Sequence, residues 1–324
     1  MKKKVNDTLK ALVFVLILIL LLTGVSYLMM PRDNTEQQWK HDVSANAFRA
    51  EPEDTLDVLF FGDSEVYTNI MPLRIWSAEG ITSYCVSSSK QNLWYTFQLM
   101  LDALQTQSPK IIFLEANAIF RYFTMDNFLL HGSELFFPVL KYHDRWKTIS
   151  FSDLTAQTQY TYIHNEKGYH FSKDINPADT THYGEPTQKM KQVSMVNRLY
   201  VQAIKSLCDR YHVRLVLLST PSTKSWNMSK HNSAESMAKA LGVEYLDLNL
   251  LQEEVPIDWS HDTRDKGDHL NIYGANKVSV YLAHYLRDTG LFADHREDPA
   301  YSVWNKAVEA FVKKHAAART FDWS

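Results

Sequence analysis

Two short segments far apart in the chain carry the residue types of a serine-nucleophile triad. Phe61-Gly62-Asp63-Ser64 follows an apolar run, and Asp265-Lys266-Gly267-Asp268-His269-Leu270-Asn271 precedes a stretch with helical periodicity. A serine hydroxyl attacks poorly until a base removes its proton, and a histidine oriented by a carboxylate supplies that base. We therefore expect Ser64 to attack an acyl carbon while His269 accepts its proton.

Two carboxylates compete for the role of orienting His269. Asp268 adjoins the histidine, and neighbouring side chains tend to diverge, whereas residues three or four positions apart can meet across a turn. Asp265 is therefore the expected acid of the triad, with Asp268 as the alternative. We expect Asp268 to support the loop or the start of the following helix.

The segments that must position these residues alternate between strand and helix patterns. Short apolar runs predict strands, and amphipathic stretches between them predict helices. This alternation favours an α/β fold with a doubly wound parallel sheet. The predicted strands span 56–61, 81–86, 110–115, 213–219 and 243–248, and the predicted helices span 72–79, 93–105, 191–211, 234–241 and 271–288.

Several polar residues follow the predicted strands directly. In an open parallel sheet the active site forms beyond the carboxyl ends of the strands. Ser64, the loop 87–90, Asn117 and His269 all fall at such ends. We therefore expect them to gather at one edge of the sheet.

The N-terminus has the pattern of a transmembrane signal anchor. Lysines at positions 2, 3, 4 and 10 flank an apolar run over 11–30. About 20 apolar residues suffice for a helix to cross a bilayer, and flanking lysines tend to stay in the cytoplasm. A cleavable signal peptide is the alternative, but its apolar region is usually shorter and ends at small residues. The sequence thus predicts a single-pass protein of the cell membrane, with its body outside the cytoplasm.

Composition and pattern divide the chain as follows. Residues 1–31 form the cytoplasmic lysines and anchor, 32–54 a polar tether, 55–293 the catalytic domain with an aromatic-rich insertion at about 119–189, and 294–324 a C-terminal helical extension. The formal net charge of −3 lacks the basic excess typical of nucleic-acid-binding proteins. Cys85 and Cys208 fall in apolar patterns that favour two buried thiols. No Cys/His spacing indicates a structural zinc site, and we expect no metal or cofactor.

The two motif segments resemble those of the SGNH, or GDSL-like, hydrolase superfamily. Gly62-Asp63-Ser64 is similar to the nucleophile block, and 265–271 is similar to the terminal acid and histidine block. The resemblance implies a flavodoxin-like fold and an oxyanion held by the serine amide, a loop amide near Ser89 and the side chain of Asn117. The chain departs from the family pattern at two places. The loop 87–90 lacks the family's glycine, and Lys266 stands where the family places its acid.

The resemblance also implies what the protein does. Membrane-anchored relatives often modify envelope polymers beside a membrane-bound O-acyltransferase. The expected function is a serine esterase or O-acyltransferase that acts on acyl esters of an envelope polysaccharide or a teichoic-acid-like polymer. The alternative is a non-catalytic subunit that binds the polymer or docks a partner in such a system.

Overall fold

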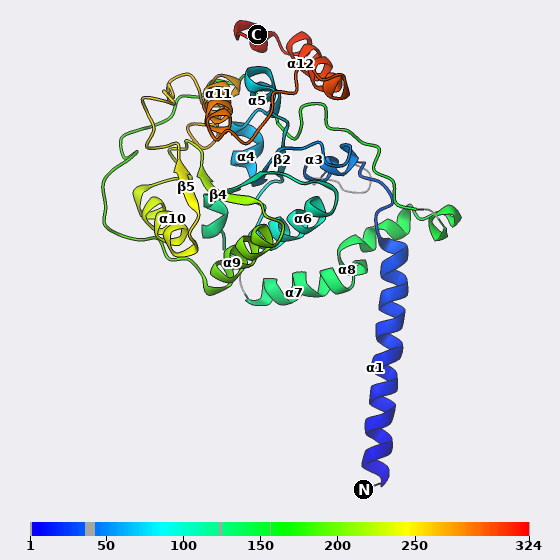
Figure 1. Ribbon diagram of the computed structural model, residues 1–324. Helices are drawn as coiled ribbons and strands as arrows, with labels where there is room; N and C mark the ends of the chain where they lie inside the picture. The colour runs from blue at the N-terminus through cyan, green and yellow to red at the C-terminus, as the bar shows by residue number, and fades with distance from the viewer. Residues whose placement is uncertain (1, 36–42, 123–124, 156, 324) are drawn as a thin grey trace. The chain divides into compact units, whose positions relative to one another are not determined.

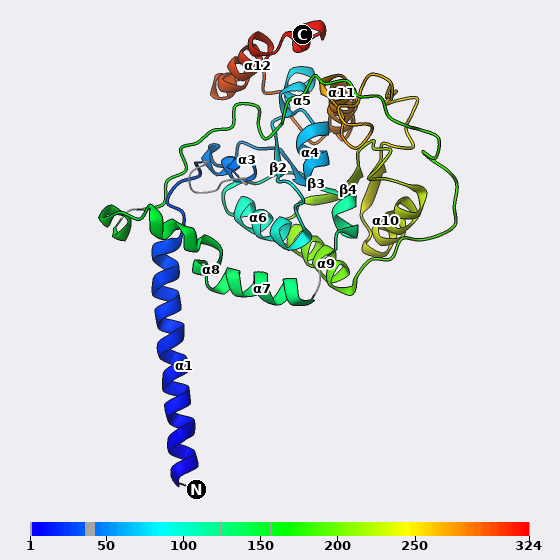
Figure 2. The same cartoon turned by 180° about the vertical axis from the view of Figure 1, so that it is seen from behind.

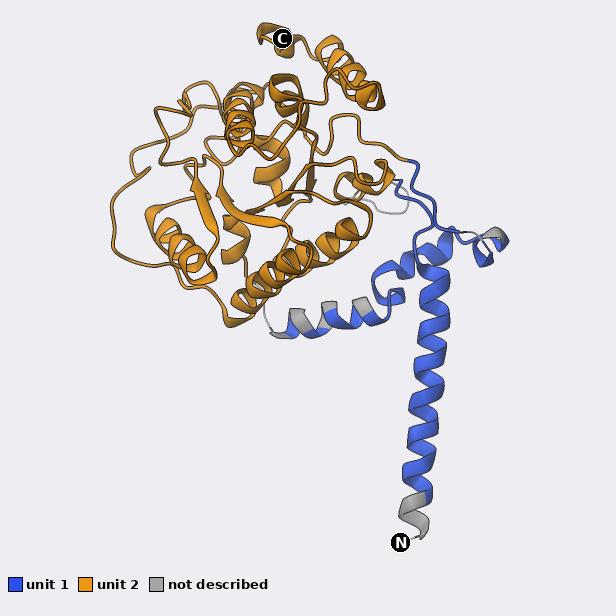
Figure 3. Cartoon of the chain, viewed as in Figure 1, with its two compact units in different colours: residues 1–40, 124–161 blue, residues 41–123, 162–324 orange. Residues whose placement is uncertain are grey.

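The computed structural model describes residues 2–35, 43–122, 125–155 and 157–323. The chain forms two compact units, coloured separately in Figure 3. The first unit comprises residues 1–40 and 124–161, and the second comprises 41–123 and 162–324. The boundaries expected for tether, insertion and extension stay predictions.

A five-stranded parallel sheet forms the centre of the second unit (Figure 1). Its strand order is β2-β1-β3-β4-β5. This is the flavodoxin-like order, in which the direction of winding reverses between β1 and β3. The strands are β1 Val58–Gly62, β2 Ser83–Ser87, β3 Ile111–Glu115, β4 Arg214–Ser219 and β5 Glu244–Asp247.

Helices cover both faces of the sheet. On one face lie α4 (Ser64–Asn69), α5 (Pro72–Glu79) and α11 (Ile272–Asp288). On the other lie α6 (Leu93–Thr106), α9 (Met195–Arg210) and α10 (Met228–Leu241). Seen from behind in Figure 2, α6 and α9 again lie side by side.

The alternation of side chains along β1 explains these two layers. Leu59 and Phe61 belong to the core on the α6 and α9 side, whereas Val58 and Phe60 belong to the core under α4, α5 and α11. Successive strand residues point to opposite faces, so a strand covered on both sides must be continuously apolar. The phenyl ring of Phe60 also stacks on Phe113 of β3, with ring centroids 4.9 Å apart.

Shorter elements complete the second unit. A glutamate, Glu115, caps the 3-10 turn that follows β3 by accepting from the amides of Asn117 and Ala118. The remaining elements are α3 Val43–Asn46, η2 Ala47–Ala50, η3 Ala116–Phe120, η6 Pro299–Tyr301, α12 Ser302–Lys314 and η7 Ala316–Thr320.

The first unit is helical. Its α1 (Lys2–Met29) contains a span, Asn6–Met29, that is long and apolar enough to cross a membrane. The other elements are α7 Met125–Phe136, α8 Val139–Tyr142, η4 His143–Lys147 and η5 Phe151–Leu154. Both α8 and η4 pack against the C-terminal end of α1.

The α/β fold with a parallel sheet, as expected from the sequence, is confirmed. The largest difference in an element is the start of α10, which begins at Met228 rather than at residue 234. Asn227 caps the helix by accepting from the amide of Lys230, so the helix gains a turn that the apolar pattern does not mark. Cys85 and Cys208 are buried free thiols, as expected.

Candidate active site

Ser64 is the first residue of α4, directly beyond the carboxyl end of β1. Asp63 caps this helix through a hydrogen bond from the amide of Glu65 to its Oδ1 (3.0 Å), and its other oxygen pairs with the guanidinium of Arg121. Gly62 is required by a close approach, because a Cβ there would lie 2.5 Å from the Cβ of Glu115. The strand-to-helix turn is therefore fixed on both sides of the serine.

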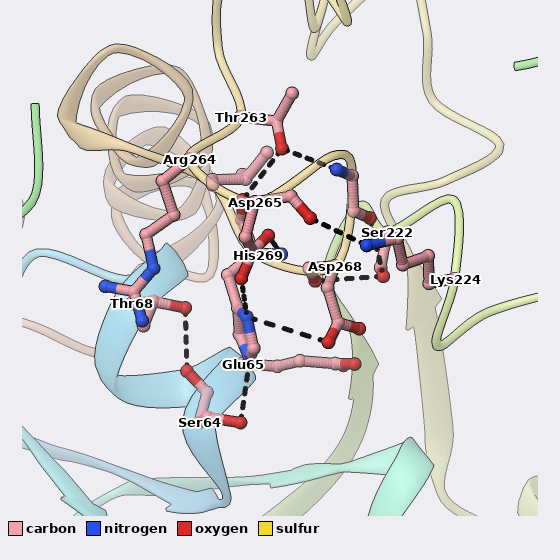
Figure 4. Close-up of polar contacts among 12 residues, drawn as sticks. Ser64, Glu65, Thr68, Ser222, Lys224, Thr263, Arg264, Asp265, Asp268 and His269 are labelled. Atoms are coloured by element: carbon pink, nitrogen blue, oxygen red, sulfur yellow. Dashed lines mark hydrogen bonds and ion pairs between the residues drawn. The ribbon is translucent and has the colours of Figure 1, made fainter. Parts of the chain in front are cut away.

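The structure brings Ser64, His269 and Asp265 together in one chain of contacts (Figure 4). The Oγ of Ser64 lies 2.8 Å from Nε2 of His269, and Nδ1 of His269 lies 2.5 Å from Oδ2 of Asp265. The amide of His269 also donates to Oδ1 of Asp265, at 2.7 Å. Asp265 thus holds both the ring and the backbone of the histidine.

The loop that carries Asp265 and His269 places its acid four positions before the histidine, because Lys266 stands at the position three before it. An isolated antiparallel bridge between Thr263 and Leu270 closes the loop. Inside it, Lys266 and Gly267 adopt positive φ angles of 66° and 90°. A Cβ at Gly267 would lie 2.1 Å from Oγ1 of Thr223, so glycine is needed at this bend. This bend lets a carboxylate four positions before the histidine reach its Nδ1.

Asp268 occupies a different position from Asp265. Its Oδ2 lies 3.9 Å from Nδ1 of His269, beyond hydrogen-bond length, while its Oδ1 accepts from Oγ of Ser225 at 2.7 Å. The carbonyl of Asp268 accepts from Oγ of Ser222. Asp268 therefore ties the histidine loop to the loop after β4.

The titration behaviour of Asp265 fits a carboxylate paired with a histidine. Burial opposes its ionisation, but hydrogen bonds from the ring and amide of His269 outweigh burial, so the pKa of Asp265 lies below its usual value. The side chain of His269 is 15% exposed and that of Asp265 is 37% exposed. The imidazole of His269 is thus sheltered, while Asp265 stays charged near neutral pH.

Asn117 lies in η3, directly beyond the carboxyl end of β3. Its Oδ1 accepts from Nζ of Lys230 at 2.7 Å, and its Nδ2 faces Oε1 of Glu65 at 3.4 Å. A lysine has only donors, so its contact fixes which end of the amide is the oxygen. The amide nitrogen of Asn117 is therefore held on the side of Glu65, the residue that follows Ser64.

Ser89 lies in an exposed turn after β2. The ends of β1 and β2 are paired, with Gly62 opposite Ser87, so Ser89 and Ser64 leave the sheet at the same edge. Among the described residues, no hydrogen bond joins Ser89 to Ser64, His269 or Asn117, and none occupies the amide of Ser64. The Ser64 amide is therefore available to an oxyanion, and the role of Ser89 stays a prediction.

A buried pair of acidic residues beside Ser64 was not predicted from the sequence. Glu65 and Glu115 are 3% and 1% exposed, and both lie with Lys230 around a small cavity. Burial raises the pKa of Glu65, and burial with the nearby charge of Glu65 raises that of Glu115 well above its usual value. The interaction between the two carboxyls lowers the pKa of Glu65 and raises that of Glu115.

Two features of the sequence could have signalled this pair. Glu65 directly follows Ser64, and Glu115 ends a buried strand. Lys230 gave no such signal because it falls before the predicted start of its helix. Burial lowers the pKa of Lys230, although the two nearby glutamates counteract this effect. Its ammonium group is the cation that faces the acid pair.

Two groups of side chains have the composition of a metal site. One is Asp265 with Asp268 and His269, and the other is Asp63 with Glu65 and Glu115. In the first group Nδ1 of His269 already contacts Asp265, and in the second Asp63 already pairs with Arg121. The hydrogen bonds of these residues account for both groups, and we assign neither to a metal.

Comparisons with known proteins returned structural similarity only. No family model matches the chain, and no curated protein matches it. A candidate acylhydrolase from Bacteroides fragilis matches at 9% identity with a TM-score of 0.38, covering 79% of this chain and 97% of its own. A GDSL-like lipase from Bacteroides thetaiotaomicron matches at 10% identity with a TM-score of 0.38, covering 76% and 99%. A candidate GDSL-like lipase from Parabacteroides merdae matches at 10% identity with a TM-score of 0.35, covering 75% and 99%.

Matches of this identity and TM-score say nothing about the reaction, so the chemistry is inferred from the residues of this chain. In its two motif segments, 62–64 and 265–271, the chain resembles GDSL-like hydrolases.

Proposed function

We propose that this chain is a membrane-anchored serine enzyme that cleaves or transfers acyl esters outside the cytoplasm. The observation that carries the proposal is the continuous contact from Oγ of Ser64 through His269 to Asp265. A base in hydrogen-bond contact with a hydroxyl, itself oriented by a carboxylate, is the arrangement that activates a serine nucleophile.

The reaction would run in two halves. In the first, Oγ of Ser64 bonds to the acyl carbon while Nε2 of His269 takes the hydroxyl proton. The ester carbon–oxygen bond then breaks, and His269 returns the proton to the leaving alcohol. In the second half, His269 deprotonates an incoming water or sugar hydroxyl as its oxygen bonds to the acyl carbon of the acyl-serine. The bond between the acyl carbon and Oγ then breaks, and His269 returns the proton to Oγ of Ser64. Water makes the enzyme an esterase, and a hydroxyl of a polymer makes it an O-acyltransferase.

The oxyanion of each tetrahedral intermediate needs donors that are already in place. We assign this role to the amide of Ser64, an amide near Ser89 and Nδ2 of Asn117. The contact of Lys230 with Oδ1 of Asn117 supports the assignment, because it keeps the nitrogen end of the amide directed away from the lysine. Lys230 thereby acts as a positioning residue.

An unpaired arginine supports an anionic polymer as the substrate. Figure 4 shows the side chain of Arg264 extending toward Thr68, one turn of α4 after Ser64. Among the described residues its guanidinium has no hydrogen bond or ion pair, while its charge acts on Asp265 and His170. A guanidinium binds carboxylate or phosphate well. A teichoic-acid-like polymer or an acidic polysaccharide would supply such groups, and a membrane-bound O-acyltransferase could supply the acyl group.

Fluorophosphonate labelling of the full chain in detergent tests the proposal. We expect the native protein to be labelled at Ser64, and Ser64→Ala and His269→Ala to lose that label while Asp268→Asn keeps it. Screening of acyl donors and acceptors would then separate hydrolysis from transfer. A folded native protein that takes no label at Ser64 would refute the catalytic proposal and favour a subunit that binds the polymer.

A further inference from the structure

A group of exposed apolar side chains lies in the first unit, outside the candidate active site. It occupies residues 136–154, from the end of α7 through α8, η4 and η5, and we call this segment the collar. Phe136 is 76% exposed, Trp146 65% and Phe151 88%. Leu140 and Leu154 are 43% and 44% exposed. Such a concentration of exposed apolar side chains marks a surface that contacts something other than water.

The collar is fixed to the C-terminal end of α1. Arg145, only 7% exposed, donates to the carbonyls of Leu28 and Met30, and it pairs with Asp153 inside the collar at 3.2 Å. The amide of Val139 donates to Oγ of Ser26 at 3.2 Å. The collar therefore holds a fixed position along the axis of α1.

That position corresponds to the outer boundary of a bilayer. Residues 11–29 of α1 form an apolar helix of about 29 Å at 1.5 Å per residue, close to the roughly 30 Å thickness of the hydrocarbon core. Side chains from Leu9 to Leu21 are exposed, whereas Ser26 is only 4% exposed. One side of the last turns of α1, at Ser26, is thus covered by the collar, while Val25 and Tyr27 stay exposed.

The chemistry of the collar fits the membrane interface. Tryptophan and other aromatic residues concentrate there, with basic side chains that reach the headgroups. Nζ of Lys147 lies 5.9 Å from the ring centroid of Trp146, and Nζ of Lys141 lies 5.3 Å from that of Tyr142. An ammonium beside an aromatic ring suits the level at which acyl chains meet anionic headgroups.

We propose that the collar lies in the outer interface of the same bilayer that α1 spans, with Phe136, Trp146 and Phe151 inserted among the lipids. The occupant of this surface is lipid, since the collar packs against the C-terminal end of a helix whose own exposed side chains suit hydrocarbon. The collar then sets the height and tilt at which the chain leaves the membrane.

Site-directed spin labelling of the full chain tests this proposal. The single variants Phe136→Cys, Trp146→Cys and Phe151→Cys would carry a nitroxide in vesicles of phosphatidylcholine and phosphatidylglycerol. Native Cys85 and Cys208 are buried, and burial raises the pKa of each thiol, so neither competes for the label. Leu16→Cys on α1 reports insertion of the anchor, and Val303→Cys, 48% exposed on α12, serves as the aqueous control.

We expect collisions with molecular oxygen to exceed those with a water-soluble nickel chelate several-fold at the three collar positions and at residue 16, with the reverse at residue 303. Collar labels that behave like residue 303 while residue 16 reports lipid would overturn the proposal. Collar labels that collide with the nickel chelate in pure lipid vesicles but not in native membranes would also overturn it. That result would assign the surface to a protein partner. Loss of Ser64 labelling alone would leave this inference untouched.

Discussion

Replacing Asp265 by asparagine should reduce catalysis far more than the same change at Asp268. Both residues are carboxylates near Nδ1 of His269, and both side chains are 37% exposed. They differ in distance, at 2.5 Å for Asp265 and 3.9 Å for Asp268. The pair is therefore a matched comparison in which position is the main variable.

The magnitude follows from these two contacts. A hydrogen bond to a charged partner contributes about 1.5–3 kcal/mol, or roughly 10- to 150-fold in rate. Asparagine could also hold His269 in the wrong tautomer, which can bring the total loss to about 10⁴-fold in a triad. Asp268 makes no hydrogen bond to the ring, and two charges about 4 Å apart in a water-like dielectric interact by about 1 kcal/mol, or roughly fivefold.

The assay is hydrolysis of p-nitrophenyl acetate by the full chain in detergent, followed as kcat and KM over pH. We expect Asp265→Asn to lower kcat by about 10²- to 10⁴-fold with little change in KM, and Asp268→Asn to lower it by less than about tenfold. Circular dichroism would confirm that both variants fold. Equal losses in the two variants, or a larger loss at Asp268, would refute the assignment of Asp265 as the acid.

Three further outcomes are expected. Lys230→Met should lower kcat about 10²-fold with KM nearly unchanged, because the amide of Asn117 loses the contact that orients it; a change in KM alone would contradict this. Arg264→Gln should raise KM about tenfold for acyl esters that carry a carboxylate or phosphate and leave KM for p-nitrophenyl acetate unchanged, and equal changes would remove the anion-binding role. Burial lowers the pKa of His164 to about 4, so the unfolded chain binds more protons below pH 6.5. The contribution of neutral His164 to the free energy of unfolding is fully present above pH 6.5. It is lost as the pH falls to about 4, and the loss is at most about 3 kcal/mol. Protonation of His164 would also break the hydrogen bond that its Nδ1 accepts from the amide of Gly168. Urea unfolding at pH 7 and 4.5 should therefore show a smaller pH effect in His164→Gln than in the native chain, and an unchanged effect would refute this role.

Much of the fold was predictable because the strands are buried on both faces. Continuous apolar runs such as 111–114 have few alternatives to a central parallel strand. Turn chemistry was harder to predict. The early start of α10 depends on the cap at Asn227, and an asparagine of this kind is equally common in loops.

The sequence predicted Ser64, His269 and Asn117 at one edge of the sheet because each falls at the carboxyl end of a predicted strand, and turn spacing favoured Asp265 over Asp268. The φ angles at Lys266 and Gly267, which bend the histidine loop, follow from no spacing rule. Lys230 reaches Asn117 across 113 positions of sequence. Contacts of this kind appear only when the layers have packed.

The charge balance around the nucleophile explains how a glutamate can follow the proposed catalytic serine. A fully ionised pair of buried carboxylates would repel the negative charge that develops on an acyl oxygen. Burial raises the pKa of both Glu65 and Glu115, which disfavours a doubly charged pair, and the ammonium of Lys230 lies near both carboxyls. Within this group the ammonium of Lys230 donates to Oδ1 of Asn117. Lys230 thus holds the amide of Asn117 in position. The raised pKa values of Glu65 and Glu115 limit the negative charge near the oxyanion that Asn117 is proposed to stabilise.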